Sequence, residues 1–438
     1  MEPTQLIRNA FNSYTFRAFV IFILILILFI PQKMVTNLIG ERTYRSITAT
    51  SEITQSWGKS QQVDGPILCI PYVVPITNLQ NKSIESETRY LYLLPEQLNV
   101  DGKINPQILY RKIYKAVVYS STLNLTGSFD MTEATKNFPR ECSRIIWEDA
   151  SVQFSLSDYK GIKDILKINL GNNSYELKPD QSEFFGHAFV SKVNIAADAV
   201  LNFDMNFQLN GSDQIEFTPI GKQTKVAIAS PWSTPSFYGS FLPENREVKD
   251  SSFKANWNVL YTNRQYGNIL FEKPSGFNLD VLGVKFLFPI NPYQSTQRAV
   301  DYAILIIGAS FLVFFLFEVL RKKKIHAIQY LLVGISLCIF YTLLLSLSEH
   351  LGFNISYLIA SLATIGLITS YSISVFKEKM PSFLMGLSLS CLYGYMYIML
   401  QMEDYALLTG SIGMFIVMAV VMFLTRKINW YGNTANEN

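Results

Sequence analysis

The chain has 438 residues, of which 49% are hydrophobic and only 16% are charged. Soluble domains carry about 25% charged residues, so this composition excludes an intrinsically disordered chain and argues against a soluble enzyme. The formal net charge is +3, which gives no global basic field of the kind that nucleic-acid-binding proteins carry. We therefore predict a membrane protein whose surroundings are the lipid bilayer and whose partners include no nucleic acid.

The first apolar run covers residues 18–30 and follows two basic residues, Arg8 and Arg17. Thirteen residues cover about 20 Å, so the helix must continue toward Leu38 to cross about 30 Å of hydrocarbon. A signal peptide also begins with basic residues and a short apolar run, but residues 31–40 offer no pair of small residues for cleavage. We predict that residues 1–38 form a cytoplasmic N-terminus and an uncleaved transmembrane helix.

Residues 39–299 are predicted to form a large external domain, with both one and two subdomains left open. Its first segment, residues 41–62, has helical composition and ends before Gly65-Pro66. Two interpretations stay open for this segment, which are a stalk that continues the first membrane helix and an ordinary helix on the domain surface.

The middle of the external domain is predicted to be rich in β-strands. Residues 201–210 alternate strictly between apolar and polar side chains, which is typical of a half-buried strand. Asn210-Gly211 is a hairpin signal before a further strand at 214–218. Similar patterns occur at 152–156, 165–170 and 224–229. The sequence therefore predicts a sandwich or two packed sheets.

The external domain carries no convincing catalytic motif. The pattern S-x-x-K, which begins at Ser56, Ser157 and Ser251, lacks the S-D-N and K-T-G partners of penicillin-binding enzymes and is read as chance. No two of the three histidines have metal-ligand spacing. We predict no enzymatic activity, no catalytic residues, no metal and no cofactor. Cys69 and Cys142 leave open a disulfide or two free thiols.

Five further apolar runs crowd the C-terminal third, at 300–320, 328–347, 357–376, 383–400 and 405–424. Basic clusters at 321–324, 377–379 and 426–427 alternate with short connections that carry no Lys or Arg. Because basic loops stay in the cytoplasm, this pattern predicts six spans with both termini cytoplasmic. Residues 300–424 would form a five-helix bundle and residues 425–438 a cytoplasmic tail.

Three ionisable residues near the membrane are weak candidates for function, because charge in hydrocarbon is costly. Glu318 could bind a proton or ion, or could pair with the cations at 321–324. Glu349 and His350 could bind a headgroup or shuttle protons, or could cap an exposed helix end. Gly386, Ser390 and Gly394 recur every four residues and are read as a helix-packing face.

The chain resembles the CreD family of bacterial inner-membrane proteins, also called the colicin-tolerance (Cet) family. The resemblance runs over nearly the whole length and follows the order of several segments: GERTYRS, VDGPILCIPY, LYLLPEQL, SPWSTPSFYGSFLPENREV and IHAIQYLLVGISLCIFYTLLLSLSEHLGFNISYLIA. It implies a periplasmic domain and an association with envelope integrity and cell-wall stress, including β-lactam challenge. It supplies no catalytic residues, but its membrane motifs draw attention to Ser348, Glu349, His350, Glu318, Gln329 and Tyr330.

Taken together, these features predict an α+β membrane protein with one N-terminal transmembrane helix, a β-rich periplasmic domain and a C-terminal bundle of five helices. The expected function is non-enzymatic, with the periplasmic domain binding a protein, lipid or cell-wall component. The alternative is a transporter or membrane-embedded enzyme that acts on a lipid-linked or amphipathic envelope component and requires Glu318, Glu349 and His350. The oligomeric state is not determined by the sequence.

Overall fold

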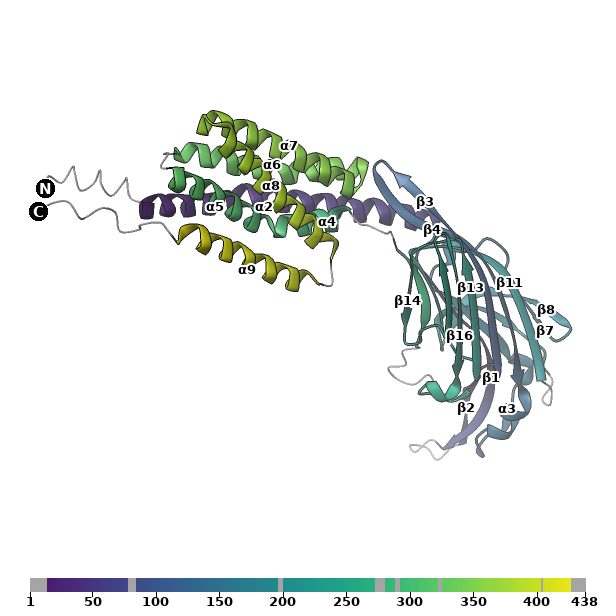
Figure 1. Ribbon diagram of the computed structural model, residues 1–438. Helices are drawn as coiled ribbons and strands as arrows, with labels where there is room; N and C mark the ends of the chain where they lie inside the picture. The colour runs from purple at the N-terminus through teal and green to yellow at the C-terminus, as the bar shows by residue number, and fades with distance from the viewer. Residues whose placement is uncertain are drawn as a thin grey trace, which may run out of the picture. The chain divides into compact units, whose positions relative to one another are not determined.

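The computed structural model describes residues 14–77, 84–195, 200–271, 280–287, 292–321, 325–402 and 405–426. The chain divides into two compact units. The helical unit comprises Met1–Ser46 and Ile290–Asn438, and the β-rich unit comprises Ile47–Pro289. The predicted domain boundaries at 39 and 299 concern the two sides of the membrane, which this division does not test, so they stay a prediction. Figure 1 shows the helices of the first unit and the strands of the second.

A single helix, α2 (Tyr14–Trp57), contains the first apolar run and most of the segment that follows it. Most of residues 41–62 therefore continue the first membrane helix, which is the first of the two interpretations of this segment. The helix ends at Trp57, and strand β1 begins at Gln61. In the β-rich unit, the indole Nε1 of Trp57 donates a hydrogen bond to the Tyr119 carbonyl at 3.0 Å, which fixes the last turn of α2.

The β-rich unit is built from two sheets. The first has ten strands, with seven in the order β14-β18-β12-β1-β6-β10-β9 and with β2, β5 and β17 paired off this path. Its strands are β1 (Gln61–Thr77), β2 (Ile84–Leu93), β5 (Arg144–Ile145), β6 (Ser151–Leu156), β9 (Lys178–Ser182), β10 (Gly186–Lys192), β12 (Gln214–Phe217), β14 (Pro235–Gly239), β17 (Ile269–Leu270) and β18 (Leu282–Phe286).

The second sheet has eight strands in the order β15-β16-β13-β3-β4-β11-β7-β8. Its strands are β3 (Gln97–Arg111), β4 (Tyr114–Asp130), β7 (Lys167–Leu170), β8 (Asn173–Glu176), β11 (Val200–Ser212), β13 (Gln223–Ser230), β15 (Asn245–Lys249) and β16 (Ser252–Leu260). A short helix, α3 (Met131–Asn137), follows β4. Among the described residues of this unit there are also three 3-10 helices: η1 (Trp147–Asp149), η2 (Tyr159–Gly161) and η3 (Tyr261–Asn263).

The two sheets enclose one hydrophobic core. Buried residues of both sheets belong to a single cluster, and the rings of Phe154 in β6 and Phe207 in β11 pack edge to face with centroids 5.5 Å apart. This arrangement confirms the prediction of two packed sheets. Along β11, Phe203, Met205 and Phe207 are buried while the intervening polar side chains are exposed, as the alternating pattern requires.

The predicted hairpin at Asn210-Gly211 is wrong. Strand β11 continues to Ser212, and the chain turns at Asp213, whose φ is 59°. The next strand, β12, pairs with β1 and β18 in the other sheet, so the chain crosses between the sheets instead of returning along β11. Gly211 serves close packing, because a Cβ at this position would overlap the ring of Tyr119.

In the ranges that the structure describes, the helical unit contains the first part of α2 and six C-terminal helices. These are α4 (Pro292–Asp301), α5 (Ala303–Arg321), α6 (Ala327–Leu351), α7 (Phe353–Phe376), α8 (Lys379–Gln401) and α9 (Ala406–Thr425). Of the described residues, those of α2, α5, α6, α7 and α8 are long and apolar enough to cross a membrane. The apolar stretch of α9 that the structure describes, Leu408–Phe423, is shorter, so the sixth span stays a prediction.

Most of helix α4 lies within residues 39–299, the region that the sequence assigned to the external domain. Its buried residues include Tyr293, Thr296 and Ala299, while polar residues occupy the rest of its surface. The amphipathic helix packs against α6, which explains why it belongs to the helical unit.

Candidate functional site

Helix α2 presents one narrow face to the other helices of its unit. Its buried side chains in this part are Leu24, Leu28, Val35 and Ile39, and their spacing of four, seven and four residues keeps them on one side. Leu28 lies against Gly334 of α6, where a Cβ would overlap the Leu28 side chain. The absence of a side chain at Gly334 therefore lets α2 approach closely.

Glu318 lies at one end of this face and is almost completely buried, at 2% exposure. Its carboxylate forms an ion pair with the guanidinium of Arg17 in α2. Its second oxygen accepts a hydrogen bond from the Tyr330 hydroxyl of α6 at 2.9 Å. We call these three residues the Glu318 cluster. A buried carboxylate needs such partners, because an unpaired charge is costly in a medium of low dielectric constant.

The cluster differs from the pairing that the sequence suggested. The sequence placed the partner of Glu318 among the neighbouring cations at 321–324, whereas the structure pairs it with Arg17, 301 positions away in the chain. The side chains of residues 321–324 lie outside those that the structure describes. The pairing with these cations therefore stays a prediction, and Arg17 is a partner that the sequence did not indicate.

Glu349 forms a second cluster of the same composition. Its Oε1 accepts a hydrogen bond from the Tyr293 hydroxyl of α4 at 3.1 Å, and its Oε2 lies 3.8 Å from the Nη1 of Arg42 in α2. The Glu349 side chain is 9% exposed, whereas that of Arg42 is 38% exposed. We call Glu349, Arg42 and Tyr293 the Glu349 cluster. His350 is exposed in the last turn of α6 and makes no hydrogen bond or ion pair with another described residue.

Both clusters connect α2 to the helices around it in the same way. In each cluster, a carboxylate of α5 or α6 forms an ion pair with an arginine of α2 and accepts a hydrogen bond from a tyrosine hydroxyl. Arg17 and Arg42 are 25 positions apart, which corresponds to about 37 Å along a helix. This length exceeds the hydrocarbon core of about 30 Å, so the clusters lie beyond opposite ends of the apolar run.

Sequence reasoning found the two carboxylates and missed both arginine partners. The signal that would have found the arginines is that each end of the apolar run of α2 carries an arginine, while the corresponding ends of α5 and α6 carry a glutamate. One arginine precedes this run and the other follows it, and an unmatched glutamate lies at each corresponding end of α5 and α6.

The predicted small-residue face of α8 is only partly used for packing. Gly386 is buried against Thr369 of α7, whose Oγ1 would lie 2.7 Å from a Cβ at this position. Ser390 and Gly394 are exposed, and no described atom outside its own helix lies within 4 Å of a Cβ built at Gly394.

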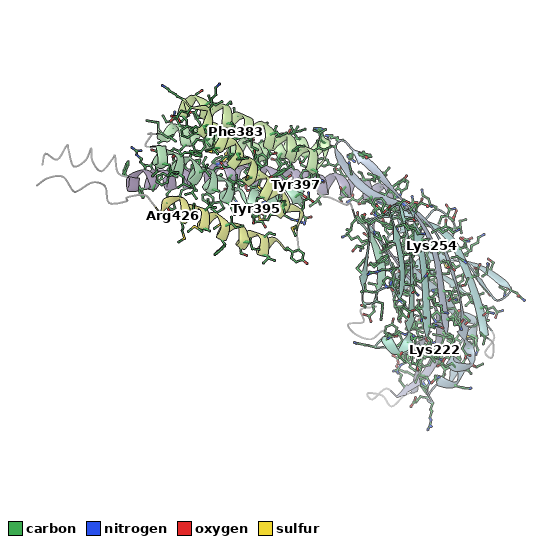
Figure 2. All side chains as sticks on the ribbon, in the orientation of Figure 1. Lys222, Lys254, Phe383, Tyr395, Tyr397 and Arg426 are labelled. Carbon is green, nitrogen blue, oxygen red and sulfur yellow. The ribbon has the colours of Figure 1, made fainter. Side chains whose placement is uncertain are left out.

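The outer face of the eight-stranded sheet carries a groove of about 360 Å³. Ala227 and Ala229 of β13 form its floor. One wall is Asp101 and Lys103 of β3, and the other is Lys254 and Asn256 of β16, with Lys254 labelled in Figure 2. Thr122 and Asn124 of β4 extend the first wall. We call this feature the β13 groove.

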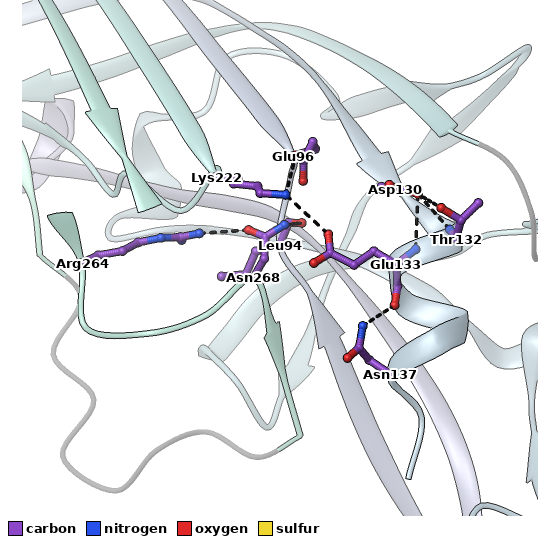
Figure 3. Close-up of polar contacts among 9 residues, drawn as sticks. All are labelled: Leu94, Glu96, Asp130, Thr132, Glu133, Asn137, Lys222, Arg264 and Asn268. Carbon is purple, nitrogen blue, oxygen red and sulfur yellow. Dashed lines mark hydrogen bonds and ion pairs between the residues drawn. The ribbon is translucent and has the colours of Figure 1, made fainter. Parts of the chain in front are cut away.

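A separate polar cluster joins β4, α3 and the loop before β13 (Figure 3). The Nζ of Lys222 lies 2.8 Å from a carboxylate oxygen of Glu96 and 3.9 Å from one of Glu133. The hydrogen bond with Glu96 raises the pKa of Lys222. Asp130 caps the first turn of α3 by accepting hydrogen bonds from the backbone N–H groups of Thr132 and Glu133. These contacts fasten α3 to the sheet and need no ligand.

Other candidates for chemistry are committed to the fold. The hydroxyls of Ser56 and Ser157 donate to the backbone carbonyls of Glu52 and Ser60. Cys69 and Cys142 are both free thiols, and burial raises the pKa of Cys69 to about 12. Within the described ranges, no group of three His, Cys, Asp or Glu residues is arranged to hold a metal ion.

Comparison with known proteins gives consistent results. A family model described as "Inner membrane protein CreD" matches residues 13–431. The chain is 34% identical to the inner membrane protein CreD of Escherichia coli (strain K12), in an alignment that covers 93% of this chain and 91% of the relative. Both similarities include α2, the two sheets and the C-terminal helices. This chain is therefore a member of the CreD family of inner membrane proteins.

Proposed function

We propose that this chain is a non-enzymatic protein of envelope integrity and cell-wall stress response, anchored in the bacterial inner membrane. The β-rich unit would lie in the periplasm and bind a protein, lipid or cell-wall component. The helical unit would anchor the β-rich unit in the membrane, and α2 would link the anchoring unit to the binding unit. The observation that carries this proposal is the continuity of α2 from Tyr14 to Trp57, with partners in both units.

The use of charge in the helical unit supports anchoring. An ion pathway needs titratable groups that can exchange their partners, whereas Glu318 and Glu349 each hold an arginine of α2 and a tyrosine hydroxyl. If the arginine left either glutamate, the buried carboxylate would lose the charge that compensates it. The two clusters are therefore suited to holding α2 in place.

The distribution of basic residues supports the proposed orientation. Lys377 and Lys379 follow α7 closely, and Arg426 follows α9. The connection between α6 and α7 contains Gly352 and no basic residue. Under the positive-inside rule, both termini would then be cytoplasmic and residues of about 39–299 periplasmic. Reporter fusions after Arg426 and within the β-rich unit should give opposite cellular sides, and equal sides would contradict this orientation.

The binding role is tested by photo-crosslinking in cells from single positions on the outer faces of the two sheets. Mass spectrometry of the products should identify one recurrent protein, lipid or glycan. Substitution of the residues that crosslink to it should abolish both the crosslink and complementation. Uniform weak labelling from every position would contradict a specific binding face.

The alternative, a transporter or membrane-embedded enzyme, is tested by substitution in the helical unit. Glu349→Gln with His350→Ala keeps a hydrogen-bond acceptor for Tyr293 and removes the titratable groups. Our proposal expects complementation when protein abundance, followed by immunoblot, equals that of the wild type. Loss of complementation at unchanged abundance would favour the alternative.

A further inference from the structure

The β13 groove is formed by residues that lie in register across three strands. Ala229 is paired with Lys103 on one side and Lys254 on the other, and Ala227 is paired with Asp101 and Asn256. Adjacent strands are about 4.8 Å apart, so the two walls are about 10 Å apart over an alanine floor. This width admits a single extended polymer chain that lies along β13.

The polar side chains of the groove have no partners within the described part of the protein. No hydrogen bond or ion pair to another described residue involves the side chains of Asp101, Lys103, Asn124, Lys254 or Asn256.

The neighbouring positions of the same sheet face behave differently. Asn258 accepts a hydrogen bond from Gln223 at 3.0 Å and donates one to Glu244 at 3.4 Å. Farther along the same face, Asn169 of β7 donates to Asp204 of β11 at 3.4 Å. Some polar side chains of this face therefore bind one another, whereas those that line the groove have donors and acceptors available for a ligand.

The charges around the groove favour an anionic ligand. Lys103 and Lys254 flank one end of the floor. Lys225 lies two positions before Ala227 in the sequence, on the same exposed side of β13. Asp101 is the acidic residue of the lining. Glu247 of β15 lies beside Lys254 in the register and forms an ion pair with Lys249 at 3.1 Å. With that pair counted as neutral, the three lysines and one aspartate leave a local excess of positive charge, while the carboxylate and the amides retain acceptors for hydroxyl groups.

We propose that the β13 groove binds a single strand of an acidic glycan, in which Lys103 and Lys254 hold carboxylates of the sugar chain. Asp101, Asn256 and Asn124 would bind its hydroxyl groups. This inference rests on the proposed function, because it names the ligand of the β-rich unit.

Other polymers fit the groove less well. The exposed lining consists of polar side chains and alanines, whereas protein partners usually need aromatic or large apolar anchors. Single-stranded nucleic acid is normally held by stacking on aromatic rings, which the described lining lacks. A hydroxyl-rich chain with separated carboxylates matches both the amides and the lysines.

The test is binding of short oligogalacturonate to the full-length protein in lipid nanodiscs, measured by isothermal titration calorimetry. The matched ligand is the methyl ester of the same oligosaccharide, which keeps the hydroxyls and removes the charge. We expect the acid to bind at least about tenfold more tightly than the ester, as one charge-assisted contact would give. Glycan strands released from purified cell wall, which carry carboxylates on a different sugar, serve as the second probe.

Variants separate a groove from general electrostatic attraction. Lys103→Gln with Lys254→Gln should weaken binding of the acidic oligosaccharide by about tenfold or more. The control, Lys167→Gln with Lys178→Gln, removes the same charge from exposed positions outside the groove and should leave the affinity unchanged. Ala229→Ile fills the floor without changing the charge and should also abolish binding. Circular dichroism of each variant verifies the fold.

Three results would overturn the proposal: no binding of either acidic probe, equal binding of the methyl ester, or equal binding of a single-stranded oligonucleotide of similar charge. Complementation distinguishes the two levels of the argument. If the groove variants lose glycan binding but complement fully, the site stands and the proposed function fails. If they retain glycan binding while substitutions on another face abolish complementation, the glycan site fails and the binding role of the unit stands.

Discussion

Removing the charge of Glu318 should destabilise the helical unit strongly, because the carboxylate is 2% exposed and paired with Arg17. Glu318→Leu leaves the guanidinium without its partner and the Tyr330 hydroxyl without its acceptor. Breaking one side of a buried ion pair costs about 3–5 kcal/mol. The Arg17 side chain is 18% exposed and lies at the start of the apolar run, so it can reach polar surroundings, and we expect a cost of about 3 kcal/mol.

The double variant, Arg17→Leu with Glu318→Leu, removes both charges at once. Its cost should be about 1 kcal/mol, because apolar residues of similar size can replace a buried pair with little loss. The coupling energy of the cycle would then be about 2 kcal/mol or more. The free energy of unfolding is measured by steric trapping in lipid bilayer discs, with a biotin pair placed across α2 and α6.

Glu41 and Arg45 provide the control. This pair belongs to the same helix and its side chains are 54% and 58% exposed. Glu41→Gln should cost less than about 0.5 kcal/mol, because exposed pairs of this spacing contribute little. If the Glu318→Leu and Arg17→Leu costs simply add in the double variant, the two side chains do not interact and the clamping of α2 by the Glu318 cluster is refuted.

Three further predictions concern packing, capping and thiol reactivity. Gly334→Val should destabilise the helical unit by about 1–3 kcal/mol because it overlaps Leu28, and Leu28→Ala in the same chain should recover part of the loss in the same unfolding assay. Asp130→Ala should cost the β-rich unit about 1 kcal/mol through loss of the α3 cap. Hydrogen bonding lowers the pKa of Asp130 in the folded protein below its ordinary 3.8. The stabilisation by the cap is therefore present above pH 3.8 and is lost as the pH falls through the pKa of the folded state. If the stability of Asp130→Ala fell in parallel with that of the wild type across this range, the prediction would be contradicted. A water-soluble maleimide at pH 8 should label Cys142 and spare Cys69, whose pKa burial raises to about 12, and intact-mass spectra showing neither thiol labelled after denaturation would indicate a disulfide instead.

Much of the architecture follows from patterns that are local in the sequence. The apolar runs identify the helices of the membrane, because a helix that crosses hydrocarbon must satisfy its backbone internally and expose apolar side chains. The alternation at 201–210 identifies β11, because successive side chains of a strand point to opposite faces. Such signals need only the residues within one element.

The exceptions show where local patterns stop. Asn210-Gly211 carries the turn signal of a hairpin, yet Gly211 is required for its contact with Tyr119, and the strand continues. The extent of α2 beyond the first apolar run also stayed open, because helical composition fits a stalk and a surface helix equally well.

The functional geometry was decided by the tertiary structure. The sequence showed that Glu318 and Glu349 were unusual, but only folding brings Arg17 and Arg42 to them, across 301 and 307 positions. The β13 groove likewise depends on the pairing of β13 with β16 and with β3, and the pairing with β3 joins residues more than 100 positions apart. Hydrophobic periodicity fixes which side of an element is buried, whereas the identity of its neighbour depends on how all the elements pack together, and so both the ion pairs and the groove were beyond the reach of the sequence alone.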